Sequence, residues 1–101
     1  MNESVFLSSK PVRGIISIKN LTNGKVFLTV TENAWKTFKN ERFALDMGMH
    51  DCQSLQEEYT ETGLEVFVIE LDQEAGAEDD LTTLLEERKE HYRRLGAILY
   101  R

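Results

Sequence analysis

The feature that most constrains this chain is an Asn-Gly pair between two strand-like runs. The first run covers residues 14–20 and the second covers residues 25–30, both rich in Ile, Val, Leu and Phe. Asn23 and Gly24 tolerate the positive φ that a tight turn needs, so this arrangement is the strongest short-range signal for a β-hairpin. We expect two antiparallel strands joined at this turn.

Two helices are predicted directly after the hairpin. Asn33 is a suitable N-cap for the first, and Gly48 can supply its left-handed end. Asp51 is expected to cap the second, which ends at Gly63. The first helix has an apolar stripe, which favours packing against a sheet; its members are Ala34, Phe38, Leu45 and Met49.

A third strand and a last helix complete the pattern. Residues 65–71 alternate between apolar and polar side chains, as in a half-buried strand, and residues 72–80 are predicted to be an acidic loop. Asp79 or Asp80 then caps a helix over residues 81–95. Its inner face is predicted to be Leu81, Leu84, Leu85, Tyr92 and Leu95, with Arg88 in the middle of the stripe.

The predicted order is strand, strand, helix, helix, strand, helix. That order is typical of an α+β domain, here a three-stranded antiparallel sheet flanked by three helices. A chain of 101 residues is long enough for one modest core. We expect an N-terminal lead over residues 1–12, which contains the only proline, and a single domain over residues 13–101. Gly96 ends the last helix, and residues 97–100 are predicted to pack back as an apolar tail.

The net charge of −6 argues against a broad electrostatic grip on nucleic acid or on an anionic membrane. Cations do gather near the C-terminus. We interpret them as a solvated helix face balanced by neighbouring glutamates, with a local basic patch as the alternative. Cys52 is the only cysteine, which fits a reducing cytoplasm, and no apolar run approaches the length of a membrane span. The cations are Arg88, Lys89, Arg93, Arg94 and Arg101; the glutamates are Glu86, Glu87 and Glu90.

Motifs at matching spacings resemble the GIY-YIG nuclease domain. Gly14-Ile15-Ile16 looks like the first family motif, and Phe27-Leu28-Thr29 falls where the second is expected. The resemblance extends over roughly residues 13 to 100 and implies the ββααβα fold. The further residues that recur at family-like spacings are Arg42-Phe43-Ala44-Leu45, Gly48, His50, Leu55-Gln56, Gly63 and Phe67.

The resemblance also implies a set of catalytic positions, and most of them carry other residues here. The family cleaves phosphodiester bonds with two tyrosines, a helix arginine, a metal-holding glutamate and often a late asparagine. The tyrosine positions are Ile16 and Phe27, and the arginine position is Thr37, so three of the chemical groups are missing. The glutamate position is left open: the motif points to Glu86 or Glu87, whereas helical phase points to Arg88. The late asparagine is replaced by Arg101.

The sequence therefore favours a GIY-YIG-like domain that has lost nuclease activity and serves as a binding or interaction module. The alternative is a divergent endonuclease, which alone would require Mg²⁺ or Mn²⁺. Arg42 as a substitute for the lost arginine is disfavoured by its place on the helical wheel. We expect His50 to be a surface or capping residue, and Arg88 to bring positive charge near the former catalytic cleft. The partner is left open between protein and nucleic acid, with only weak nucleic-acid binding and no membrane association.

Overall fold

The computed structural model describes residues 11–101 and confirms the predicted fold class. The strands are β1 (Gly14–Asn20), β2 (Val26–Thr31) and β3 (Phe67–Glu74). The helices are α1 (Ala34–Asp46), α2 (Gln53–Thr62) and α3 (Leu81–Arg94), with a short 3₁₀ turn, η2 (Leu64–Val66), before β3. Among these residues no helix is long and apolar enough to cross a membrane.

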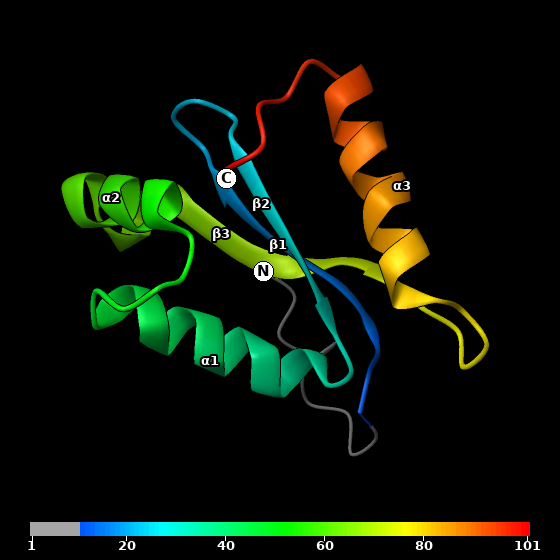
Figure 1. The fold of residues 1–101 in the computed structure, drawn as a ribbon. Coiled ribbons are helices and arrows are strands. Elements are labelled where there is room, and N and C mark those ends of the chain that lie inside the picture. Colours follow the sequence, from blue (N-terminus) through cyan, green and yellow to red (C-terminus); the bar gives the residue numbers. More distant parts are fainter. Residues whose placement is uncertain (1–10) are drawn as a thin grey trace.

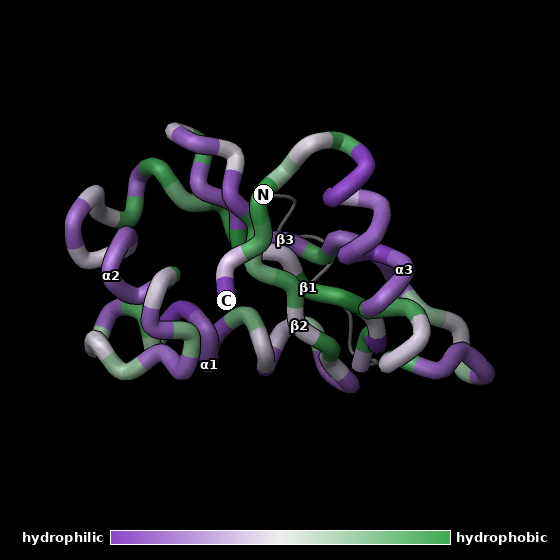
Figure 2. Tube along the Cα trace, turned by 45° about the horizontal axis from the view of Figure 1, so that its top comes forward, coloured by the Kyte–Doolittle hydropathy of each residue, from purple (hydrophilic) through white to green (hydrophobic). Residues whose placement is uncertain are grey.

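The sheet has the strand order β2-β1-β3, and both pairings of β1 are antiparallel. The predicted hairpin pairs Lys19 with Val26 and Gly14 with Thr31. Helices α1 and α2 cover one face and α3 covers the other (Figure 1). A sheet covered on both faces needs a central strand that is apolar on both sides, and the strands form the hydrophobic centre of the molecule (Figure 2).

Adjacent side chains of β1 accordingly enter two separate cores. Ile16 lies in the core beneath α1 and α2, with Leu45, Leu55 and Phe67 among its neighbours. Ile15 lies in the core beneath α3, and both isoleucines are fully buried. The sheet therefore separates residues that are neighbours in the sequence into two cores. Each candidate site residue can contact only groups on its own side of the sheet.

Several predicted boundaries are confirmed by local contacts. The side chain of Asn33 accepts a hydrogen bond from the Lys36 N–H, and Asp80 accepts one from the Thr83 N–H. Both are therefore N-caps. Gly48 and Gly63 have positive φ values of 73° and 88° at the ends of α1 and α2.

Other predicted boundaries were wrong. Asp51 does not cap α2: Cys52 occupies the N-cap and makes no side-chain cap bond. Met49 and Leu95 lie beyond the last turns of α1 and α3, and they are 65% and 68% exposed. In addition, β3 begins at Phe67 and continues to Glu74, so the first part of the predicted acidic loop is strand. The loop is shortened because β1 is long enough to keep pairing with it, as far as Gly14 with Glu74.

We predict that Gly14→Ala destabilises the domain. A Cβ atom at Gly14 would lie 2.1 Å from the backbone oxygen of Gln73, and backbone in a paired strand cannot easily yield. Overpacking of this kind costs about 1–3 kcal/mol of unfolding free energy. Chemical denaturation checks the loss. Gly76→Ala is the matched control, because its Cβ meets only the Asp79 side chain, at 3.5 Å. Equal stability of the two variants would contradict the close approach.

Candidate functional site

The three positions that the resemblance assigns to the family's tyrosines and arginine lie on the α1–α2 side of the sheet. Ile16 is fully buried in that core, and Phe27 packs against it. Thr37 shares a hydrogen bond of 2.6 Å with the hydroxyl of Thr31. The structure thus brings these positions to one side, where they carry an alkyl chain, a phenyl ring and a paired hydroxyl. None of the three can exchange a proton near neutral pH or neutralise a phosphate.

A histidine that sequence reasoning placed at the surface lies beside Phe27. The side chain of His50 is only 3% exposed, and its ring meets that of Phe27 edge-on at 5.1 Å. Its Nδ1 accepts a hydrogen bond of 2.9 Å from the Cys52 N–H, so Nε2–H donates to Glu41, at 2.5 Å. The expected surface position was wrong, whereas the contact with Cys52 does satisfy an N–H at the start of α2.

The three alternatives for the family's glutamate position, which are Glu86, Glu87 and Arg88, do not all lie on the same side of α3. Arg88 points toward the sheet, as its helical phase predicts, and its Nε donates to Asp72 at 2.7 Å. The Asp72 side chain is 4% exposed and also accepts from the Tyr92 hydroxyl. The hydrogen bond with Asp72 raises the pKa of Arg88. Glu86 and Glu87 are exposed on the outer side of α3.

A charge-neutralised pair therefore occupies the space between α3 and β3. Arg88 and Asp72 lie on the α3 face of the sheet, whereas Ile16 and Phe27 face α1 and α2. Among residues 11–101, no group of three or more His, Cys, Asp or Glu side chains is arranged to hold a metal ion.

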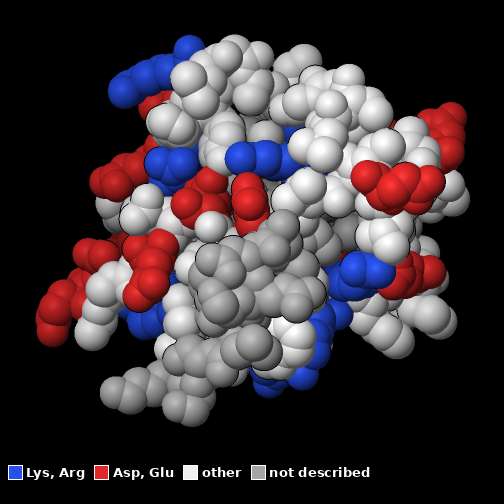
Figure 3. All heavy atoms as spheres, turned by 180° about the vertical axis from the view of Figure 1, so that it is seen from behind, with Lys and Arg blue, Asp and Glu red and all other residues white. Residues whose placement is uncertain are grey.

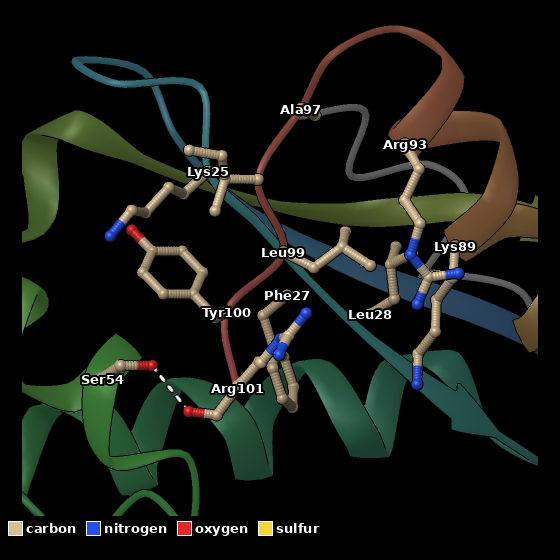
Figure 4. A pocket seen from close by; sticks show the side chains of 11 residues that line it. Lys25, Phe27, Leu28, Ser54, Lys89, Arg93, Ala97, Leu99, Tyr100 and Arg101 are labelled. Atoms are coloured by element: carbon tan, nitrogen blue, oxygen red, sulfur yellow. Dashed lines mark hydrogen bonds between the residues drawn. The ribbon is translucent and has the colours of Figure 1, made fainter.

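Phe27 also lines a groove at the outer edge of β2. The groove has a volume of about 700 Å³ and runs between β2, α3 and the C-terminal tail. Phe27 and Leu28 lie along it, with Lys89 and Arg93 extending from α3 on one side and Arg101 on the other (Figure 4). The other lining residues are Lys25, Ser54, Ala97, Ile98, Leu99 and Tyr100.

We call this the basic groove, because the described part of the chain lines it with four Lys and Arg residues and with no Asp or Glu. Lys25 directs its ammonium to Glu58, at 2.8 Å. The pairs made by Lys89 and Arg93 are looser, with nearest carboxylate oxygens at 4.0 and 3.7 Å. Lys89, Arg93 and Arg101 are therefore the cations available to a ligand. Sequence reasoning left a local basic patch open as an alternative but favoured a solvated helix face for these cations. The i, i+4 spacing of Lys89 and Arg93 was the signal that they share one side of α3.

The C-terminal tail forms one wall of the groove and pairs with β2. The Val26 N–H donates to the Ile98 carbonyl at 3.0 Å, and the Tyr100 N–H donates to the Val26 carbonyl at 2.9 Å. The Ser54 hydroxyl donates to the Arg101 carbonyl at 2.8 Å. The predicted packing of residues 97–100 is confirmed, and these bonds give Arg101 its place beside Phe27.

Glu58 of α2 holds the end of this wall. Its carboxylate accepts hydrogen bonds from Lys25, from the Tyr100 hydroxyl, and from the amides of Asn20 and Asn23, at 2.7 to 3.0 Å. Burial alone would raise the pKa of Glu58, but the bonds from Lys25, Asn23 and Tyr100 outweigh it and lower the pKa to about 2. Burial and the contact with Glu58 raise the pKa of Tyr100 to about 12.

Comparison with known proteins relates this fold to endonuclease domains. No protein-family model and no curated protein matches the chain. Among solved structures, a mutant of the catalytic domain of intron endonuclease I-TevI matches with a TM-score of 0.66 and 25% identity, over 84% of each chain. The catalytic domain of homing endonuclease I-TevI matches with a TM-score of 0.68 and 24% identity, over 86% of this chain and 96% of that one.

These matches cover most of the chain, and I-TevI is a GIY-YIG nuclease. The chain therefore has the GIY-YIG nuclease fold, and the resemblance inferred from its motifs is confirmed at the level of the fold.

We predict that Glu58→Gln destabilises the domain at neutral pH by roughly 2–3 kcal/mol, since each unit of pKa difference corresponds to about 1.4 kcal/mol. A carboxyl whose pKa is lowered on folding stabilises the folded state above its unfolded pKa. That stabilisation is lost as the pH falls from the ordinary value of 4.5 toward about 2.

Urea titrations at several pH values check this prediction. The parent chain should lose stability across that acidic window more steeply than Glu58→Gln. Glu61→Gln, at an exposed position of the same helix, is the control and should follow the parent. Parallel pH profiles for the parent and Glu58→Gln would refute the role assigned to this carboxylate.

Proposed function

We propose that this GIY-YIG-like domain does not cleave phosphodiester bonds and acts as a binding module through the basic groove. The observation that carries the proposal is the composition of the groove beside Phe27: Lys89, Arg93 and Arg101 are available there, and no Asp or Glu side chain of residues 11–101 lines it. Cations without a base or a metal ligand can hold an anionic partner, but they cannot activate water.

A divalent metal does not fit this groove. Mg²⁺ and Mn²⁺ are held by carboxylate and carbonyl oxygens, whereas the side chains that extend into the groove from α3 are Lys89 and Arg93. Their charges oppose a second cation at the same place. Glu86 and Glu87, which could supply oxygens, are exposed on a different side of the helix.

A divergent endonuclease is the second candidate, and two observations favour it. Both similar solved structures are catalytic domains of endonucleases. The pair formed by His50 and Glu41 also lies beside Phe27, and a histidine hydrogen-bonded to a carboxylate is a common general base. Against this role, the imidazole is 3% exposed and both of its nitrogens are already engaged within the protein.

We predict no cleavage of single- or double-stranded DNA or RNA by the unaltered protein at stoichiometric concentration with Mg²⁺ or Mn²⁺. Losing one group that stabilises the transition state costs about a hundredfold or more in rate, and here several groups that act together are missing. Gel analysis of end-labelled substrates measures this. Cleavage that disappears in His50→Ala, Glu41→Gln, Arg42→Ala or Glu86→Gln would overturn the proposal and support the endonuclease.

We also predict that Mg²⁺ titration leaves the amide resonances of residues 14–42 and 84–92 unshifted, because the cations of the groove oppose a bound divalent ion. Two-dimensional NMR on labelled protein measures the shifts, with Ca²⁺ at equal ionic strength as the control for non-specific effects. Saturable shifts that converge on Glu86 or Glu87 would contradict the prediction and indicate a metal site.

A further inference from the structure

The outer edge of β2 has unpaired backbone groups. In an antiparallel pair, residues alternate between bonding the neighbouring strand and pointing their N–H and C=O groups away from it. The Asn20 N–H bonds to the Lys25 carbonyl, so Lys25 points its backbone groups toward β1 and the next residue, Val26, points them away. Leu28 and Val30, two and four residues further on, point outward in the same way. The tail uses the outward groups of Val26. Within residues 11–101, those of Leu28 and Val30 have no backbone partner.

This open edge continues into the basic groove. Leu28 lines the groove directly, and Lys89 and Arg93 extend over the same stretch of β2 from α3 (Figure 4). Leu28 is 7% exposed and Val30 39%, so the edge leaves the covered part of the groove as it approaches Val30. The edge already accepts an extended segment at Val26, where Leu99 of the tail forms a parallel bridge.

We infer that the basic groove takes an extended acidic peptide segment, which adds to β2 as a fourth strand alongside Leu28 and Val30. This inference rests on the proposed function as a binding module and names its partner. Addition of a strand to an open sheet edge is an established mode of peptide recognition, in which the main chain supplies affinity and alternate side chains supply specificity. Acidic side chains at every second position would face Lys89 and Arg93.

The backbone geometry favours a peptide over a nucleic acid. Leu28 and Val30 each present both a donor N–H and an acceptor C=O at the edge. An extended peptide offers the complementary donor and acceptor at the same repeat, about 3.3 Å per residue. A phosphodiester backbone accepts hydrogen bonds and has no regular donor for these carbonyls. The charges of the groove alone suit either ligand, so the unpaired strand edge decides between them.

The probe is an acetylated and amidated peptide of eight residues that alternates threonine and glutamate, titrated into labelled protein and followed by NMR. We expect saturable shifts at Leu28, Val30 and Lys89. A peptide that alternates threonine and lysine should bind about tenfold more weakly or not at all, because the groove repels it. A glutamate peptide methylated on alternate amide nitrogens should also lose binding, since it cannot complete the strand ladder.

Two variants of the protein separate the contribution of backbone pairing at the strand edge from the contribution of the groove's positive charge. Val30→Pro removes one outward N–H without touching the β1–β2 ladder, and an edge strand tolerates proline at such a position. This variant should weaken peptide binding about tenfold. Val30→Thr keeps the N–H and is its control. Lys89→Glu with Arg93→Glu should weaken binding by at least that factor. Arg94→Glu, whose side chain is 78% exposed, is the control and should bind normally.

The outcomes also distinguish this inference from the proposed function. Binding of the glutamate peptide that survives both N-methylation and Val30→Pro would overturn strand addition. Binding of an oligothymidine that competes at Lys89 and Arg93, with no binding of the peptide, would overturn the choice of partner and assign the groove to nucleic acid. Neither result would produce phosphodiester cleavage, which is the outcome that contradicts the proposed function.

Discussion

The carboxylate of Glu58 is the contact on which the arrangement of the groove depends. It gathers donors from the end of β1, from the hairpin turn and from the C-terminal tail, three segments that no other single side chain joins among residues 11–101. Taking a charge out of water is costly unless it is well hydrogen-bonded, and four donors supply that compensation. Because Lys25 and Tyr100 are both bound to it, Glu58 fixes the hairpin against the tail, and so fixes one end of the groove that the tail encloses.

The central strand imposes the second constraint, because it divides the molecule into two cores. Ile16 belongs to the core under α1 and α2, and Ile15 to the core under α3. Phe27 packs against the same core as Ile16, so the two positions that the resemblance assigns to catalytic tyrosines belong to this interior. On the other face, Arg88 is neutralised by Asp72. The outer edge of β2, where Phe27 and Leu28 of the two faces meet the same groove, is open to a ligand.

The fold could be predicted from local signals, and the groove could not. An Asn-Gly turn, the caps Asn33 and Asp80, and glycines at helix ends act within a few residues, so sequence reveals them. Met49 and Leu95 lie three residues and one residue beyond a helix, where the apolar pattern continues although the helix has ended. Asp51 lies two residues before α2, where Cys52 occupies the N-cap. His50 was misjudged because its partners, Glu41 and the Phe27 ring, come from other segments.

The site shows the same division between local and long-range information. Ile16, Phe27 and Thr37, which motif spacing singled out, lie on one side of the sheet. The basic groove combines Lys89 and Arg93 of α3 with Arg101 of the tail and the edge of β2, and no local pattern brings these together. The open edge at Leu28 and Val30 is also invisible in sequence, because it depends on how far the tail follows β2 before it turns toward Ser54.

The net charge of −6 is compatible with a groove that binds an anionic partner. Exposed charges are screened over about 8–10 Å at physiological ionic strength, so a partner in the groove interacts chiefly with Lys89, Arg93 and Arg101. Carboxylates are spread over other parts of the surface, as the rear view shows (Figure 3). They repel an acidic partner from those parts and leave the groove as the favourable approach. The negative total and the local positive groove thus act together to orient an acidic ligand toward the open edge of β2.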